Sequence, residues 1–230
     1  MKDVKAVLFD AGNTLVWLDH PFLVELLREH GVDADPERII EAEYEAKLVM
    51  DQMVRSGRAG TDESRGRVYF HEIFRRMGVA DEAFPPLAKR LWARHAERNL
   101  WGSVRERTAE TLEELRRRGL RLGVISNADG RVDALLAAVG LREHFDFVID
   151  SALVGMEKPD PRIFCMGLER LGVAPEEAVY VGDIYEIDVV GARAAGMAAV
   201  LVDPLNRWTE LDCDRIAAIH ELPAWLDRAA

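Results

Sequence analysis

Residues 4–17 read VKAVLFDAGNTLVW, an apolar run that ends in a carboxylate and a turn of small residues. The run 4–9 has the length and composition of a buried strand, and Asp10 follows it directly. A carboxylate in this place either caps the next element or takes part in chemistry. Two residues further on, where a second carboxylate would be most useful to a catalyst, the chain has Gly12. The remainder of the sequence has to decide between these interpretations.

Four later runs have the same strand-like composition, and helical patterns that each end on a glycine lie near them, as is common at helix C-termini. The apolar runs are 121–125, 146–149, 178–181 and 198–202, and the helical patterns are 105–119, 130–140, 161–172 and 188–196. Nearly continuous apolar strands that alternate with helices indicate a parallel sheet covered on both faces. We therefore expect a doubly wound α/β fold.

Residues 18–99 break this alternation. Apolar residues recur there at helical spacing, with little that indicates a strand, in the segments 21–30, 36–55, 63–77 and 84–98. We interpret this block as a helical insertion after the first strand, which leaves 1–17 and 100–230 as the core. Its aromatic residues are expected to form a hydrophobic core of its own, made by Tyr44, Tyr69, Phe70, Phe74 and Trp92.

The composition argues against several classes of protein. A formal net charge of −11 over 230 residues disfavours non-specific binding to nucleic acid, which needs a basic face. No apolar run approaches the roughly 20 residues that span a bilayer, and the N-terminus does not resemble a signal peptide. Cys165 and Cys213 lack the spacing of a metal site or a disulfide framework. We expect a cytoplasmic protein with reduced thiols and neither a nucleic-acid nor a membrane partner.

Polar side chains follow the predicted strands at the edge of the sheet where open α/β folds bind ligands. In chain order they are Asp10, Thr14, Ser126, Asn127, Lys158, Asp183 and Asp188. Each alone has a structural explanation as a turn or helix cap, and Asp160 with Pro161 likewise suits a helix start. Their shared position at successive strand ends favours a functional site.

This set of residue types suits phosphoryl transfer to a carboxylate. A phosphate dianion repels an attacking carboxylate, so the site must cancel charge, and Mg²⁺ does so with only one or two protein carboxylates. Asp10 would ligate the ion with one oxygen and attack with the other. Asp183 would be the second carboxylate, and Lys158 would add a fixed positive charge.

The remaining polar groups suit substrate binding and orientation. Ser126 and backbone N–H groups near Asn127 and in the turn that contains Thr14 would hydrogen-bond the phosphoryl oxygens. Asp188 would orient Lys158 or metal-bound waters.

Four segments resemble, in order, the motifs of the haloacid dehalogenase superfamily. They are VLFDAGNTL at 7–15, VISNAD at 124–129, EKPDPRIF at 157–164 and VYVGDIYEIDVVGARAAGM at 179–197. The resemblance implies a Rossmann-like core with an α-helical cap domain inserted after the first strand. It also implies that Asp10 is the nucleophile, Ser126 a phosphoryl binder and Lys158 the neutralising lysine. Mg²⁺ would then lie on Asp10, Asp183 and the carbonyl of Gly12.

The departure from the family pattern lies at Gly12. Phosphatases of this superfamily usually have a second Asp there, which protonates the leaving oxygen and later activates water. Gly12 can do neither, although its carbonyl remains for a metal. General acid–base catalysis contributes about 10²–10⁴-fold, so a slowed phosphatase is physically possible. Asp19 or His20 would be a substitute acid, but a cap of the helix starting near Pro21 explains them better.

Our interpretation is a Mg²⁺-dependent phosphohydrolase that acts on a small phosphorylated metabolite through an aspartyl-phosphate. The alternatives are a catalytically weakened phosphate- and Mg²⁺-binding regulatory protein, a haloacid dehalogenase and a phosphonatase-type hydrolase. Dehalogenases of the superfamily need no metal and lack the Gly-Asp that Asp183 completes here. A phosphonatase needs a Schiff-base lysine in the cap, where Lys47 and Lys89 are expected to be solvated. The sequence leaves substrate identity and the choice between monomer and homodimer open.

Overall fold

The computed structural model describes residues 3–58 and 60–229. Contacts divide the chain into two compact units, the first made of Met1–Trp17 and Ser103–Ala230 and the second of Leu18–Gly102. We call them the core unit and the cap unit. The second boundary lies at residue 102, where the sequence suggested 99. None of the helices in these described residues is long and apolar enough to cross a membrane.

The core unit contains a six-stranded sheet with the order β5-β4-β1-β6-β7-β8, and every neighbouring pair is parallel. Its strands are β1 (Ala6–Phe9), β4 (Arg121–Ser126), β5 (Phe147–Asp150), β6 (Ala178–Gly182), β7 (Ala198–Val202) and β8 (Asp214–Ile216). The first five confirm the predicted strands. The sixth, β8, was not predicted, because its three residues Asp-Arg-Ile carry no apolar run.

Strand β1 occupies the middle of the sheet and is buried on both faces. Phe9 is in register with Val124 of β4 on one side and Val181 of β6 on the other. The strand order changes direction at β1, because β4 and β5 extend the sheet to one side and β6, β7 and β8 to the other. Ligands bind at such switch points in open α/β sheets. Asp10 therefore follows β1 at the position where the fold favours a site.

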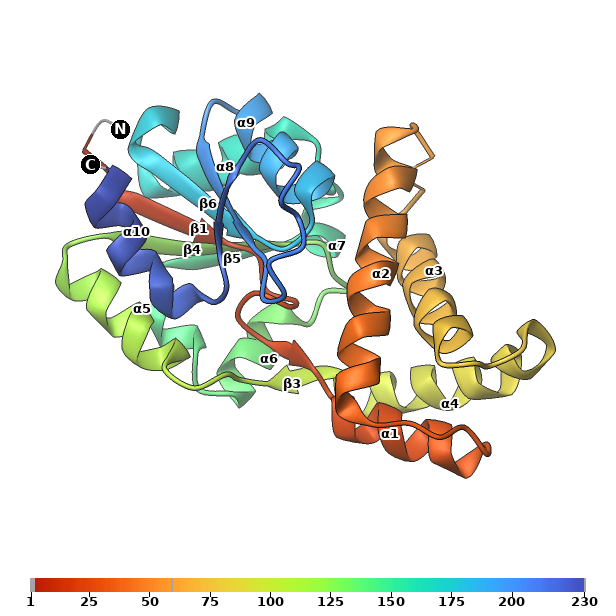
Figure 1. The fold of residues 1–230 in the computed structure, drawn as a ribbon. Helices are drawn as coiled ribbons and strands as arrows, with labels where there is room; N and C mark the ends of the chain where they lie inside the picture. Colours follow the sequence, from red (N-terminus) through yellow and green to blue (C-terminus); the bar gives the residue numbers. More distant parts are fainter. Residues whose placement is uncertain (1–2, 59, 230) are drawn as a thin grey trace. The chain divides into compact units, whose positions relative to one another are not determined.

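Helices cover both faces of the sheet (Figure 1). One face carries α8 (Pro161–Leu171) and α9 (Val190–Ala194), and the other carries α5 (Thr108–Arg117), α6 (Val132–Ala138) and α10 (Leu222–Ala229). Shorter turns are α7 (Ser151–Val154), η2 (Arg142–His144), η3 (Pro175–Glu177), η5 (Ile219–Glu221) and the π-helical η4 (Tyr185–Val189). The predicted caps of α8 are confirmed. Asp160 accepts from the Arg162 N–H at 3.0 Å, and Gly172 ends the helix in the left-handed conformation.

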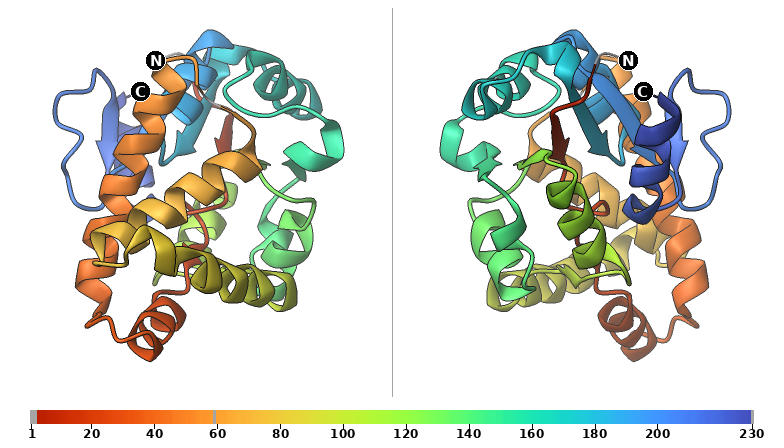
Figure 2. Two further views of the ribbon diagram at one scale, coloured as in Figure 1. Left: turned by 90° about the vertical axis from the view of Figure 1, so that its right-hand side faces the viewer. Right: turned by 90° about the vertical axis from the view of Figure 1, so that its left-hand side faces the viewer.

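The cap unit is built of helices (Figure 2). They are α1 (His20–Glu29), α2 (Pro36–Arg55), α3 (Asp62–Arg76), η1 (Asp81–Ala83) and α4 (Phe84–Glu97), which confirms the four predicted helical segments. A small strand pair, β2 (Trp17–Leu18) and β3 (Trp101–Ser103), spans the two unit boundaries. It was not predicted, because strands of two and three residues are too short to leave a pattern.

The aromatic residues of the cap unit form its hydrophobic core, as predicted. Tyr44, Tyr69, Phe70 and Phe74 are buried, and the half-buried Trp92 meets Phe70 edge to face at 5.5 Å between ring centroids. The expected cap of α1 is also confirmed, since the Asp19 carboxylate accepts from the Phe22 N–H at 3.2 Å.

The expectation of solvated lysines in the cap is wrong for Lys47, which is 4% exposed, and right for the exposed Lys89. Lys47 lies one helical turn after the buried Glu43 on α2, and its Nζ is 3.6 Å from Glu43 Oε1. The His20 ring makes a 2.7 Å hydrogen bond to the other Glu43 oxygen. Lys47 can be buried because its aliphatic stem packs against apolar surface and its charge is paired with Glu43.

Candidate active site

Lys158 joins three segments of the core unit that are far apart in sequence. Its Nζ donates to Asp10 Oδ1 at 2.6 Å, to Asp188 Oδ1 at 2.7 Å and to the Tyr180 hydroxyl at 2.9 Å. The lysine is 2% exposed. An ammonium group has three N–H donors, so each of them has an acceptor in this network. The arrangement fixes one positive charge against the carboxylate that follows β1.

The backbone of Lys158 is held by Asn127, which follows β4. The Asn127 amide donates to the Lys158 carbonyl at 2.9 Å and accepts from the Lys158 N–H at 2.8 Å. The Asn127 side chain therefore joins two loops at the sheet edge. A substrate contact from residue 127 would have to come from its backbone N–H, and that role stays a prediction.

Asp188 lies within the π-helical turn η4, a kind of irregularity that is frequent at functional sites. Its Oδ2 accepts from the backbone N–H groups of Asp183 at 3.0 Å and Ile184 at 2.9 Å. Gly182 permits this close wrapping, because a Cβ there would meet the Asp188 carboxyl carbon at 2.4 Å. The end of β6 is thus shaped around one carboxylate that faces Lys158.

The other predicted site residues follow the same strands. Asp183 comes directly after β6, Ser126 ends β4, and Thr14 lies in the turn after Asp10; all three are buried. The Thr14 hydroxyl has no hydrogen-bond partner among the described residues, which is uncommon for a buried polar atom. Gly12 is partly exposed, and its φ lies outside the left-handed region. The catalytic, substrate-binding and metal-binding roles of these residues stay predictions.

The electrostatics of the site are set by three carboxylates and one lysine. Burial raises the pKa of Asp10 to about 7, the Lys158 charge opposes this, and the charges of Asp188 and Asp183 add to it. Burial works against the ammonium of Lys158, but Asp10 and Asp188 hold its pKa well above the usual range. Burial likewise raises the pKa of the Tyr180 hydroxyl well above its ordinary value. Lys158 therefore stays charged, and Asp10 is ionised at a cost.

This donor set fits a divalent cation. Three buried carboxylates, Asp10, Asp183 and Asp188, share one buried lysine, and a bound cation would neutralise the excess negative charge. No group of three or more His, Cys, Asp or Glu side chains in residues 3–58 and 60–229 is arranged to hold a metal by itself. Mg²⁺ commonly takes one or two protein carboxylates and completes its shell with water and phosphate.

Sequence reasoning missed Tyr180. Its hydroxyl donates to the Ile125 carbonyl at 2.8 Å while accepting from Lys158, so it connects β6 to the end of β4. The available signal was a tyrosine within the buried strand AVYVG, since a buried hydroxyl needs partners. Asp150 was also missed. It holds the loop after Ser126 by accepting from the N–H groups of Gly130 at 3.0 Å and Val132 at 3.2 Å.

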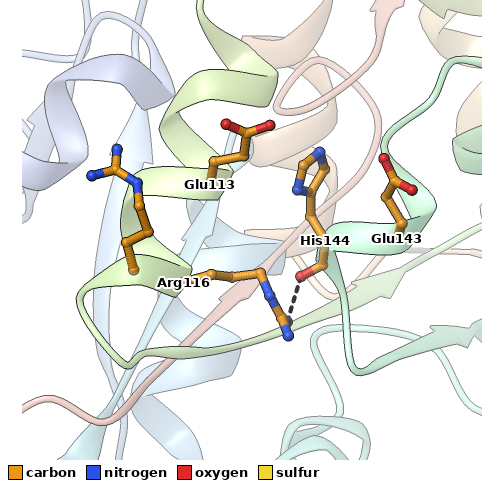
Figure 3. Close-up of a pocket in the computed structure, with 5 residues that line it drawn as sticks. Glu113, Arg116, Glu143 and His144 are labelled. Atoms are coloured by element: carbon orange, nitrogen blue, oxygen red, sulfur yellow. Dashed lines mark hydrogen bonds between the residues drawn. The ribbon is translucent and has the colours of Figure 1, made fainter.

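A surface pocket of the core unit lies apart from these residues. Figure 3 shows its lining, in which the Arg116 guanidinium reaches the His144 carbonyl at 2.9 Å. The lining residues are Glu113, Arg116, Arg117, Glu143 and His144. They belong to the second half of α5 and to η2, which precede β4 and β5, so they mark the amino edge of the sheet. The pocket shares no residue with the predicted site and does not carry the chemistry.

A search against protein families matches residues 4–196 to the family described as "Hydrolase: haloacid dehalogenase-like hydrolase". The chain belongs to the haloacid dehalogenase-like hydrolases. The match covers every element that supplies the Asp10–Lys158–Asp188 network, and it confirms the resemblance drawn from the four motifs.

Several relatives of this hydrolase have names or solved structures. It is 35% identical to haloacid dehalogenase-like hydrolase domain-containing protein 3 from Bos taurus, over 96% of this chain and 90% of the relative. It is 34% identical to glyceraldehyde 3-phosphate phosphatase from Methanopyrus kandleri, over 86% and 84% of the two chains. Both relatives match across most of their length.

Solved structures confirm the fold. A haloacid dehalogenase-type phosphatase from Thermococcus onnurineus has a TM-score of 0.61 at 28% identity, covering 97% of this chain and 98% of that one. A 2-haloacid dehalogenase from Pseudomonas syringae has a TM-score of 0.59 at 26% identity, covering 99% and 100%. The fold is therefore shared by phosphatases and dehalogenases, and the site has to distinguish them.

Proposed function

We propose that this hydrolase is a Mg²⁺-dependent phosphatase that transfers the phosphoryl group of a small phosphorylated metabolite to Asp10. The observation that carries the proposal is the Asp10–Lys158–Asp188 network, which holds a buried carboxylate against a fixed positive charge at the switch point of the sheet. A relative named as a glyceraldehyde 3-phosphate phosphatase supports the reaction class.

In this reaction an Asp10 oxygen attacks phosphorus, and the bond from phosphorus to the leaving oxygen breaks. Lys158 donates to Asp10 Oδ1, which keeps the carboxylate oriented and leaves Oδ2 as the attacking oxygen. Ser126 and the backbone N–H groups after β4 would hydrogen-bond the transferring oxygens. Water then hydrolyses the aspartyl-phosphate and regenerates Asp10.

Asp10, Asp183 and the Gly12 carbonyl would hold Mg²⁺. When bound, the ion supplies positive charge that offsets the repulsion between a phosphate dianion and the carboxylates of the site. Asp188 would act through Lys158, because its second oxygen is already bound to two backbone N–H groups.

A dehalogenase is the second candidate, because a solved dehalogenase shares the fold at 26% identity and Gly12 suits a leaving group that needs no proton. Asp183 argues against it. A buried carboxylate that acts on the charge of Asp10 would repel an anionic haloacid unless a cation were present. A phosphate- and Mg²⁺-binding regulatory protein would keep the same residues without turnover.

The deciding experiment compares wild type with Asp10→Asn on a panel of small phosphate esters, with Mg²⁺ and with a chelator. Wild type should release phosphate only with the metal, and Asp10→Asn should lose at least about 10³-fold, as expected for loss of a nucleophile. Asp133→Asn is the matched control, since Asp133 is an exposed partner of Arg142 and should leave turnover unchanged.

Three results would contradict the proposal. Full activity of Asp10→Asn would exclude Asp10 as the nucleophile. Release of halide from a 2-haloacid without metal would favour the dehalogenase. Retained Mg²⁺ and phosphate binding without turnover of any ester or acyl phosphate, esters of acidic phenols included, would favour the regulatory protein.

A further inference from the structure

We propose that the natural substrate carries a leaving group that departs as a stable anion without being protonated, as in an acyl phosphate or the phosphate ester of an acidic hydroxyl. This inference rests on the proposed phosphatase function and names the substrate class of the same site. It follows from an inventory of the proton donors around Asp10, taken group by group within the core unit.

Residue 12, two positions after Asp10, supplies no side-chain acid. Gly12 has no side chain and is partly exposed, and its φ lies outside the left-handed region. The backbone φ at residue 12 is therefore one that an L-residue can adopt. Residue 12 offers a backbone carbonyl and N–H but no acidic proton.

Lys158 is a charged donor in direct contact with Asp10, and each of its three N–H groups already has a hydrogen-bond acceptor. They go to Asp10 Oδ1, Asp188 Oδ1 and the Tyr180 hydroxyl at 2.6–2.9 Å. Donating to a leaving oxygen would require Lys158 to break one of these bonds in a buried network, which is costly.

Tyr180 has a single proton, and it already goes to the Ile125 carbonyl at 2.8 Å. Asp188 is an acceptor on both oxygens, from Lys158 on one and from two backbone N–H groups on the other. Asp183 is the proposed cation ligand and would be ionised in that role. The hydroxyls of Thr14 and Ser126 are hydrogen-bond donors but are too weakly acidic to serve as general acids.

The cap residues that directly follow the first motif are engaged within the cap unit. The Asp19 carboxylate accepts from the Phe22 N–H at 3.2 Å and pairs with Arg94 at 2.9 Å. His20 is hydrogen-bonded to Glu43 at 2.7 Å. The Asp19 carboxylate and one ring nitrogen of His20 are therefore already bound to partners within the cap unit.

The reaction then balances without an acid. Asp10 attacks phosphorus, and the bond to the leaving oxygen breaks with its electron pair staying on that oxygen, which departs as a carboxylate or an acidic oxyanion. Water later attacks the phosphorus of the aspartyl-phosphate, the bond from phosphorus to the Asp10 oxygen breaks and returns the carboxylate, and the protons of water end on inorganic phosphate. A carboxylic acid with a pKa of about 4 leaves readily in this way, whereas an alcohol does not.

The test is a series of aryl phosphates of similar shape whose nitro substituents lower the pKa of the released phenol stepwise, from unsubstituted phenyl to 2,4-dinitrophenyl. The measured quantity is kcat/KM with Mg²⁺, which reports the first phosphoryl transfer even if hydrolysis of the intermediate limits kcat. The rate with Asp10→Asn is subtracted as background. Acetyl phosphate, compared with ethyl phosphate, extends the series to a carboxylate leaving group.

Two variants of residue 12 complete the design. Gly12→Asp adds the missing acid, and Gly12→Asn adds the same bulk without one. We expect kcat/KM of wild type to fall steeply from the dinitrophenyl to the phenyl ester. Gly12→Asp should raise the rate on phenyl phosphate by at least about 10-fold, with the 10²–10⁴-fold that general acid catalysis supplies as the upper bound, and barely change the dinitrophenyl rate. Gly12→Asn should raise neither.

A wild-type kcat/KM that does not depend on the leaving group would overturn the inference, since another group would then be protonating it. A steep dependence that Gly12→Asp leaves unchanged would overturn the assignment of the missing donor to residue 12. If the variants do not fold, the dependence of wild-type kcat/KM on the pKa of the leaving group by itself tests the inferred substrate class. No activity on any member, the dinitrophenyl ester included, would instead contradict the proposed phosphatase function.

Discussion

Two buried pairs of a carboxylate and a lysine, one in each unit, have opposite electrostatic character. In the core unit, burial raises the pKa of Asp10 to about 7 although Lys158 lies 2.6 Å away. In the cap unit, burial also acts to raise the pKa of Glu43, but Lys47, His20 and Tyr69 together hold it below its ordinary value. Lys158 thus lies closer to its carboxylate than Lys47 does, yet the charged form of Asp10 is less stable than that of Glu43.

The difference lies in the charges that act on each carboxylate. Lys158 faces Asp10 and Asp188 directly, and the charge of Asp183 also acts on Asp10. Glu43 instead is the acceptor for several cationic and neutral donors. We expect a carboxylate that is ionised at a cost, next to a hydrogen-bonded lysine, to favour binding of a further cation or a substrate. Glu43, whose two oxygens are paired with His20 and Lys47, instead stabilises the packing of the cap helices α1 and α2.

The largest effect is expected from removing the lysine of each pair. Lys158→Met should lower the free energy of unfolding by about 3–5 kcal/mol, because it leaves buried carboxylates without their cation. Lys47→Met should cost clearly less, since Glu43 keeps its 2.7 Å hydrogen bond to His20. The exposed Lys89→Met is the control. Denaturant unfolding monitored by circular dichroism measures all three, and equal losses for the two buried lysines would remove the distinction.

A neutral replacement of Asp10, the proposed nucleophile, should have the next largest effect and the opposite sign. The Asp10 pKa is raised from 3.8 to about 7, so the folded protein retains a proton that the unfolded chain releases. The stability of metal-free wild type relative to Asp10→Asn should therefore fall between about pH 4 and pH 7 and stay level above that. The gain of the variant at pH 8 is expected to be about 1–4 kcal/mol.

Thermal unfolding with a chelator, at a series of pH values, checks this expectation. The matched control is Asp133→Asn, whose carboxylate lies on the surface beside Arg142. An Asp10→Asn protein that is less stable than wild type at pH 8 would show that Lys158 outweighs the burial of Asp10.

The smallest effect concerns the carboxylate of the cap. Glu43→Gln should lower stability by about 1 kcal/mol at pH 7, because the charge-assisted bonds to His20 and Lys47 are weakened. The pKa of Glu43 is lowered, so this advantage of wild type is present above about pH 4.5 and is lost as the pH falls through the lower folded value. Glu63→Gln, an exposed i,i+4 partner of Arg67, should change stability little. A difference that persisted at acidic pH would point to packing instead of charge.

Much of the fold could be predicted because its signals are local. Five apolar runs became β1, β4, β5, β6 and β7, and each of the four helical segments in the insertion became a helix. The strand β8 and the pair β2–β3 could not be predicted, because two or three residues carry no periodicity and pairing alone defines them. The burial of Lys47 was also missed, since a lysine on a helix is exposed unless distant segments cover it.

The chemical groups at the strand ends could be read from the amino-acid order: a carboxylate at Asp10, a lysine at Lys158, carboxylates at Asp183 and Asp188, and no side chain at Gly12. This order was sufficient because parallel strands place their carboxyl ends at one edge of the sheet. The use of all three Lys158 protons, the part of Tyr180 and the hold of the Asn127 side chain on the loop of Lys158 emerged from the folded chain alone. Those are distances between residues up to 148 positions apart, and no local pattern of amino acids encodes them.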